Sequence, residues 1–134
     1  MAQGIAVALP LYIDSIDGAY GLHKNLEKVV TQNLKMIILT SPGERVMVPE
    51  FGVGIRRYLF DQNTPGTQAT IDGLIRRQVA TYLPYVVIDE LSVSSPPIVG
   101  LNANEKDQTR LNIYIRYRVP GANVASDLTI PVEI

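Results

Sequence analysis

The sequence predicts an α+β fold in which two main helices pack on one face of a small antiparallel sheet. Two segments repeat apolar residues with helical spacing, and the last third alternates apolar and polar residues as strands do. The chain has 134 residues, the length of one domain. We therefore expect a single domain over residues 1–134, comprising an N-terminal arm (1–20), a helical part (21–83) and a β part (84–134).

Composition restricts the chemistry that the chain can perform. Twelve Lys and Arg against thirteen Asp and Glu give a net charge of −1, whereas nucleic-acid binding needs a positive surplus. The absence of Cys and the single histidine, His23, argue against disulfides, thiolate nucleophiles and multi-histidine metal sites. No apolar run approaches the roughly 20 residues of a membrane span. We expect no cofactor, no metal, no nucleic acid and no membrane among its partners.

The N-terminal arm alternates apolar residues over residues 5–13. Pro10 cannot donate to a ladder, so any strand here lies at a sheet edge. From His23 to Thr40 the apolar period is helical. Ser41-Pro42-Gly43 ends this helix, because the residue before proline avoids the α region.

The middle of the chain predicts two short elements. Residues 44–47 can form only a small strand. Residues 55–60 predict a short helix that turns Ile55, Leu59 and Phe60 inward.

A second long helix is expected to begin after Thr64, a good N-cap, with Pro65 at the first helical position. Pro84 ends it. Its inward stripe is predicted to consist of Ile71, Leu74, Ile75, Gln78, Val79 and Tyr82.

Three strands are expected in the last third, at Val86–Val93, Thr109–Val119 and residues 127–134, with a polar loop over 95–108. Pro120-Gly121 begins the turn between the last two, which therefore pair antiparallel. The apolar face of the middle strand should carry Leu111, Ile113, Ile115, Tyr117 and Val119, and its polar face Arg110, Asn112, Tyr114, Arg116 and Arg118.

Paired carboxylates are the one catalytic option that composition leaves open. A glycosidase needs two of them about 5–10 Å apart, and Glu44, Glu50 and Asp61 are the candidates. No spacing forces two of them to converge. We expect no enzyme, and a lysozyme-like, peptidoglycan-cleaving muramidase is the alternative function.

Several motifs resemble a known family. Residues 9–14 read LPLYID, residues 33–47 read NLKMIILTSPGERVM, and residues 49–55 read PEFGVGI. Residues 9–93 resemble the baseplate wedge proteins of contractile phage tails, namely baseplate assembly protein W, the T-even sheath-initiating wedge protein and their type VI secretion counterpart. The family motif covers Gly43, Glu44, Arg45, Pro49, Glu50, Phe51 and Gly52.

The resemblance implies a structural role in the virion tail baseplate, assembled in the host cytoplasm. Family members are present in about six copies around the tail tube and start sheath assembly. The implied partners are the tail sheath protein and other wedge proteins, with the tube or hub as further candidates. The β part is similar to the handshake domain of sheath subunits, whose sheets neighbouring chains complete.

Strand addition requires an open sheet edge. We expect either Thr109–Val119 or Asp127–Val132 to end at one. The predicted acceptor residues are Leu111, Ile113 and Ile115 as an apolar floor, together with Asn112, Tyr114 and Arg116.

Relatives carry Glu-Pro-Arg at the corner after the second helix, where this chain has Leu83-Pro84-Tyr85. We expect this corner to dock on the wedge by apolar contact. Within the motif, Glu44 and Arg45 should form a local ion pair, and Phe51 should plug the core.

Overall fold

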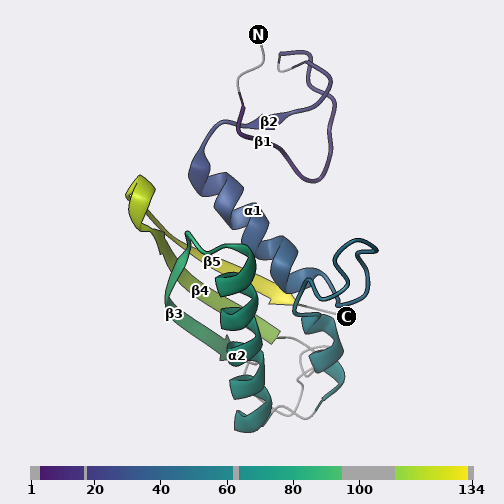
Figure 1. The fold of residues 1–134 in the computed structure, drawn as a ribbon, viewed down its shortest axis with the longest axis vertical. Coiled ribbons are helices and arrows are strands. Elements are labelled where there is room, and N and C mark those ends of the chain that lie inside the picture. The colour runs from purple at the N-terminus through teal and green to yellow at the C-terminus, as the bar shows by residue number, and fades with distance from the viewer. Residues whose placement is uncertain (1–3, 17, 62–63, 95–110, 133–134) are drawn as a thin grey trace, which may run out of the picture. The chain divides into compact units, whose positions relative to one another are not determined.

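The computed structural model describes residues 4–16, 18–61, 64–94 and 111–132, and its α+β class matches the prediction (Figure 1). Its contacts divide into two units, Met1–Leu34 and Lys35–Ile134, and the division falls within the first helix. The elements are β1 (Ala6–Val7), β2 (Leu22–His23), α1 (Leu26–Leu39), η1 (Ile55–Phe60), α2 (Pro65–Tyr82), β3 (Val87–Ser94), β4 (Leu111–Val119), η3 (Pro120–Ala122) and β5 (Val124–Val132).

The first unit joins the arm to the start of α1. β1 and β2 pair antiparallel, so the strand expected in the arm is present but only two residues long. Gln32 of α1 ties them together, because its Oε1 accepts hydrogen bonds from the Leu9 N–H and from His23 Nε2, both at 2.9 Å, and its Nε2 donates to Val7 O at 3.0 Å. His23 therefore belongs to β2 and not to the helix.

The first helix starts later than the periodicity suggests. The side chain of Asn25 accepts a hydrogen bond from the backbone N–H of Glu27 at 2.9 Å, which is the arrangement of an N-cap. A strand residue and a capping residue thus precede Leu26. The apolar periodicity extends through them and cannot mark this boundary.

The second unit contains a three-stranded antiparallel sheet in the order β3-β4-β5, with β4 in the centre. The β4–β5 register is regular, whereas β3 has a bulge between Ile88 and Glu90. One face of the sheet is core and carries the predicted apolar residues: Leu111, Ile113, Ile115, Tyr117 and Val119 from β4, and Leu128, Ile130 and Val132 from β5.

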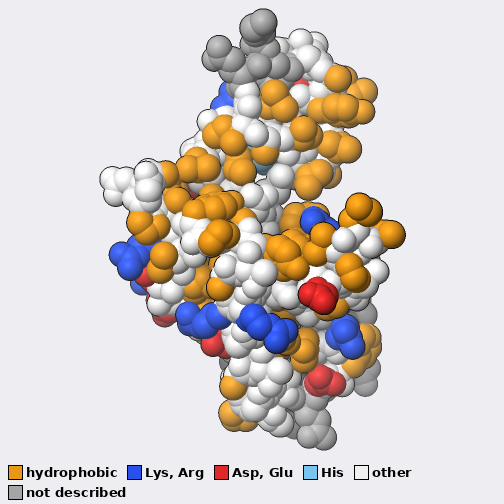
Figure 2. All heavy atoms as spheres, in the orientation of Figure 1, with side chains coloured by type: hydrophobic (Ala, Val, Ile, Leu, Met, Phe, Trp, Pro, Cys, Tyr) orange, Lys and Arg blue, Asp and Glu red, His pale blue; other side chains and the backbone are white. Residues whose placement is uncertain are grey.

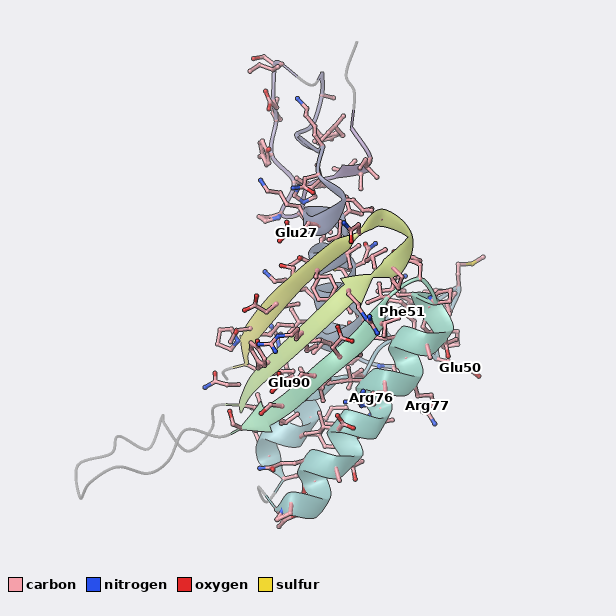
Figure 3. The ribbon with its side chains drawn as sticks, turned by 90° about the vertical axis from the view of Figure 1, so that its left-hand side faces the viewer. Glu27, Glu50, Phe51, Arg76, Arg77 and Glu90 are labelled. Carbon is pink, nitrogen blue, oxygen red and sulfur yellow. The ribbon has the colours of Figure 1, made fainter. Side chains whose placement is uncertain are left out.

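The second helix runs beside β3 in both ribbon views (Figures 1 and 3). Thr64 Oγ1 accepts a hydrogen bond from the N–H of Thr67 at 3.2 Å, which confirms the predicted cap. The helix ends at Tyr82, before Pro84. Four members of the predicted stripe are buried and Leu74 and Tyr82 are half-buried; the buried members are Ile71, Ile75, Gln78 and Val79.

Two local predictions are wrong. Residues 44–47 form bends and irregular backbone and no strand. Phe60 is 77% exposed although it was expected to face inward. Ile55 and Leu59 of this six-residue 3₁₀ helix are buried, whereas Phe60 is its last residue and the backbone becomes extended at Asp61. The polar loop expected at 95–108 lies outside the described residues.

Candidate functional site

The family motif forms a loop between α1 and η1 whose base is closed by backbone hydrogen bonds. Gly43, at φ +95°, donates its N–H to Pro49 O at 2.7 Å. The N–H of Glu44 donates to Ser41 O at 3.1 Å, and Glu44 Oε2 accepts from the N–H of Ser41 at 3.1 Å. Residues 44–48 thus form a loop whose two ends are held together by the Gly43–Pro49 hydrogen bond.

The segment that leaves the loop, residues 51–54, is hydrogen-bonded to the end of α1. Val53 donates its N–H to Ile37 O at 2.9 Å, and Gly54 donates to Thr40 O at 2.9 Å. These bonds satisfy carbonyls that a helix C-terminus leaves open. Gly52 immediately precedes these two donors at φ +105°, and a Cβ there would come within 2.1 Å of Thr40 O. The glycine at this position is therefore required by both backbone conformation and space.

Gln78 of α2 fixes the loop from the other side. Its Oε1 accepts from the N–H of Gly52 at 3.1 Å, and its Nε2 donates to Glu50 O at 3.0 Å. The side chain is 8% exposed, so both of its amide atoms need such partners. The sequence predicts that Gln78 faces inward. It does not predict the two loop contacts, because their partners lie 26 and 28 positions earlier in the chain.

An aromatic stack completes the base of the loop. The Phe51 ring packs edge-on against Tyr82, with centroids 4.9 Å apart and planes at 66°. The Arg45 guanidinium carbon lies 3.8 Å above the centre of the Phe51 ring, a cation–π contact. Phe51 is 7% exposed, which confirms it as a core residue. The expected Glu44–Arg45 ion pair is wrong, because Glu44 binds the Ser41 amide and Arg45 lies on Phe51.

The tip of the loop is apolar and exposed. Val46 is 93% and Met47 is 91% exposed, and Figure 2 shows hydrophobic side chains gathered on this loop. Both residues lie in the stretch 33–47 that resembles the family, but they are not among the predicted site residues. Their only sequence signal is an apolar pair in a segment that matches no helical or strand period.

The three candidate carboxylates do not resemble a glycosidase pair. Glu44, Glu50 and Asp61 are all exposed, and Figure 3 shows Glu50 beside the C-terminal end of α2. A general acid needs an apolar environment that keeps it protonated near neutral pH. These side chains lack that environment. Among the described residues, no group of three or more His, Asp and Glu side chains could hold a metal ion.

The structure corrects the predicted acceptor strand. β4 is central, so the backbone groups on both of its sides already face a neighbouring strand. The side chains of Leu111, Ile113 and Ile115 lie in the core at 6%, 0% and 0% exposure. The residues expected to accept a sheath strand, Leu111, Asn112, Ile113, Tyr114, Ile115 and Arg116, are therefore not on a free edge.

The polar face of β4 is occupied by contacts within the sheet. Arg116 forms an ion pair with Glu90 at 3.2 Å and donates to the Tyr114 hydroxyl at 3.0 Å. The hydrogen bond with the Tyr114 hydroxyl, followed by the attraction of the Glu90 carboxylate, raises the pKa of Arg116. Arg118 pairs with Asp89 at 3.0 Å. These pairs link β4 to β3.

The two edges of the described sheet differ. β3 carries the bulge and lies beside α2. β5 pairs with β4 over its whole length without a bulge, and no described strand pairs with its other side. β5 is therefore the regular open edge, which agrees with the expectation that one of the last two strands is free.

Proline identifies which backbone groups of β5 face outward. Pro131 has no N–H, and within sheets it occupies positions whose nitrogen faces away from the neighbouring strand. Backbone groups alternate in direction along a strand. The residues whose backbone groups point away from β4 are thus Ala125, Asp127, Thr129 and Pro131. The side chains of all four are exposed.

The corner after α2 is partly buried. Leu83 is 6% exposed, donates its N–H to Val79 O at 2.8 Å and accepts from Val86 N–H at 2.9 Å. Its side chain belongs to the core and cannot be presented to a partner, contrary to the prediction. Pro84 and Tyr85 are exposed, Tyr85 to 45%.

Comparisons with known proteins agree with the motif. Residues 24–124 match the family described as Baseplate wedge protein gp25. A protein from Geobacter sulfurreducens, to which a tail lysozyme activity has been ascribed, is similar at TM-score 0.67 and 26% identity, over 85% of this chain and 96% of that one. No curated protein matches the chain in sequence.

A second solved structure shares the fold. One chain of the anti-feeding prophage baseplate, a six-fold symmetrised structure, is similar at TM-score 0.68 and 21% identity, over 89% of this chain and 86% of that one. None of the helices among the described residues combines the length and apolar character required to cross a bilayer.

Proposed function

Because the chain belongs to the Baseplate wedge protein gp25 family, it is a component of a contractile tail baseplate, and we propose that it starts the sheath there by accepting a sheath strand on β5. The observation that carries this proposal is the regular, unpaired side of β5 in the described sheet. The proposal includes about six copies per baseplate, assembly in the host cytoplasm, and no enzymatic activity.

The chemistry of the edge suits a strand of another chain. The N–H groups of Ala125, Asp127 and Thr129 and the carbonyls of the same residues can bond to it in register. Each bond contributes about 0.5–1.5 kcal/mol net, so several must form together. On the core side, an added strand would place its apolar residues beside Leu128 and Ile130. The match requires a strand that alternates apolar and polar residues.

The same edge carries features that limit pairing between identical copies. Pro131 removes one donor from the row, and Asp127 adds a charge to its exposed face. Asp127 lies opposite Arg116 in the β4–β5 register, so its charge is partly balanced within the sheet. A free subunit can therefore keep an open edge until its partner strand arrives.

Thr129→Pro tests the proposal, because it removes an outward donor and leaves the bonds to β4 in place. We expect tails carrying this variant to form baseplates without sheath, as seen by electron microscopy. Thr129→Ala is the matched control, since it keeps the N–H, and it should give normal sheaths. Sheaths of normal length on Thr129→Pro baseplates would show that another surface recruits the sheath.

We also propose that the corner at Pro84 and Tyr85 contacts other wedge proteins. Its support is the exposed Tyr85 ring next to a buried Leu83, which anchors the corner in the core. Tyrosine is common at protein interfaces because it contributes apolar area at a small loss of side-chain entropy.

A further inference from the structure

The motif loop has a surface that strand addition on β5 does not explain. Val46 and Met47 are more than nine-tenths exposed, although two adjacent apolar side chains at a loop tip gain nothing from water contact. The tip is also held in place. Its base is closed by the Gly43–Pro49 hydrogen bond and anchored by Gln78. A preordered apolar tip loses little conformational entropy when it is buried by a partner.

Arg45 lies next to this tip, and only one face of its guanidinium group is in contact with another side chain. One face of its guanidinium is stacked on Phe51 at 3.8 Å. Within the described part of the chain no carboxylate pairs with its N–H groups. Glu44, its neighbour, is directed to the Ser41 amide. The stack holds the planar fork ready for a bidentate carboxylate, the partner that arginine recognises best.

We propose that the loop of residues 44–48 is a docking element that inserts Val46 and Met47 into an apolar pocket of another baseplate protein and pairs Arg45 with an Asp or Glu at the pocket rim. The convex tip requires a concave partner, and the unpaired guanidinium edge requires a negative charge beside it. The inference rests on the proposed function for the class of partner. It adds a recognition surface distinct from β5.

The probe is the wedge subcomplex of the same particle, purified from cells that lack this chain. The affinity of the full-length chain for this subcomplex is measured by fluorescence anisotropy. We expect the double variant Val46→Ser, Met47→Ser to bind about tenfold more weakly or worse, because both side chains lose their buried contacts. Arg45→Gln should also weaken binding and should flatten its dependence on salt concentration.

Phe60→Ser is the matched control, since Phe60 is 77% exposed, lies in the same unit and is outside the loop. It should bind like the wild type. Equal affinity of the double variant and the wild type, with both folded by circular dichroism, would overturn the inference. So would an equal loss in Phe60→Ser, because binding would then follow general surface hydrophobicity.

Other occupants of the tip give different results. Concentration-dependent dimers of the chain alone that vanish in the double variant would overturn the inference in favour of self-association. Tip-dependent binding to phosphatidylglycerol vesicles would overturn it in favour of a lipid surface. The sheath is absent from all these measurements, so a failure here is distinguishable from a failure of strand addition on β5. If the wild-type chain did not bind the subcomplex, this docking element and the proposed wedge contact at the corner would both be overturned.

Discussion

At the scale of single residues, the motif glycines and Gln78 explain why the loop has its shape. Gly52 is required because its positive φ and its approach to Thr40 O exclude a side chain. The sequence places Gly52 in the family motif but does not reveal the contact, because the approach depends on how the loop returns to the end of α1. Likewise, the single Gln in an apolar stripe indicated a buried amide without revealing its partners.

We therefore predict that Gly52→Ala lowers the free energy of unfolding by about 2–4 kcal/mol, the combined effect of strain and of a forced shift at Thr40. Urea denaturation measures it. Gly73→Ala is the control, since no heavy atom lies within 4 Å of a Cβ there. That exposed helical position should gain about 1 kcal/mol. Similar stabilities for the two variants would contradict the role assigned to Gly52.

The carboxylates give a second residue-scale prediction. Because Glu44, Glu50 and Asp61 are exposed, none lies in the apolar pocket that a general acid requires. The purified protein should therefore release no reducing sugars from peptidoglycan, and Glu44→Gln and Glu50→Gln should behave identically. Hydrolysis by the wild type that either variant abolishes would establish the muramidase alternative, the activity ascribed to the Geobacter sulfurreducens relative.

At the scale of elements, periodicity predicted the strands and their faces but not their order in the sheet. The β4 pattern of alternating residues is the same whether the strand is central or at an edge, since it records only which side chains face the core. Order is decided by pairing between distant segments, which a local pattern does not contain. For this reason the sequence predicts acceptor residues on β4 and offers β5 only as the alternative edge.

The order of the strands predicts opposite outcomes for two proline variants at paired positions. Tyr114 lies opposite Thr129 in the β4–β5 register and opposite Ser92 in the β3–β4 register. By the alternation inferred from Pro131, the N–H of Tyr114 faces β3. Tyr114→Pro should therefore cost about 3 kcal/mol or more, because it breaks a central ladder.

The N–H of Thr129 faces outward, so Thr129→Pro loses no ladder bond and should lower the free energy of unfolding by about 1 kcal/mol or less. Thermal unfolding followed by circular dichroism compares the two variants. If Thr129→Pro were the more damaging, the outward direction of its N–H would be wrong. The inferred acceptor edge would then have to be reassigned to the other residues of β5.

At the scale of the whole molecule, the corner after α2 shows how a docking surface depends on the core beneath it. The sequence predicted Leu83-Pro84-Tyr85 as one apolar contact, because the three residues replace a motif of relatives. The fold divides them, since Leu83 closes the core and Tyr85 is exposed. Which of these three residues is buried depends on the direction in which the chain leaves α2. The helical periodicity ends there, so the sequence pattern does not predict that direction.

We predict that Leu83→Asp unfolds the protein, because an unpaired carboxylate in the core costs several kcal/mol. Tyr85→Ser should keep the wild-type melting temperature and reduce incorporation into baseplates, measured by quantitative immunoblotting of purified particles. Tyr85→Phe is its control for ring area. Normal incorporation of a folded Tyr85→Ser chain would remove the corner from the docking surface.

Pro131 affects how accurately a partner strand can be aligned along β5. A sheath is a repeating array, so any error in seating its first subunit is copied into every later one. On a uniform strand edge, a partner could slip by two residues, about 6.6–6.8 Å, and still present the same face. The proline makes the row of outward donors unequal, because one position cannot donate. If β5 accepts a sheath strand, this missing donor distinguishes the seated position from its slipped neighbours and sets the origin of the array.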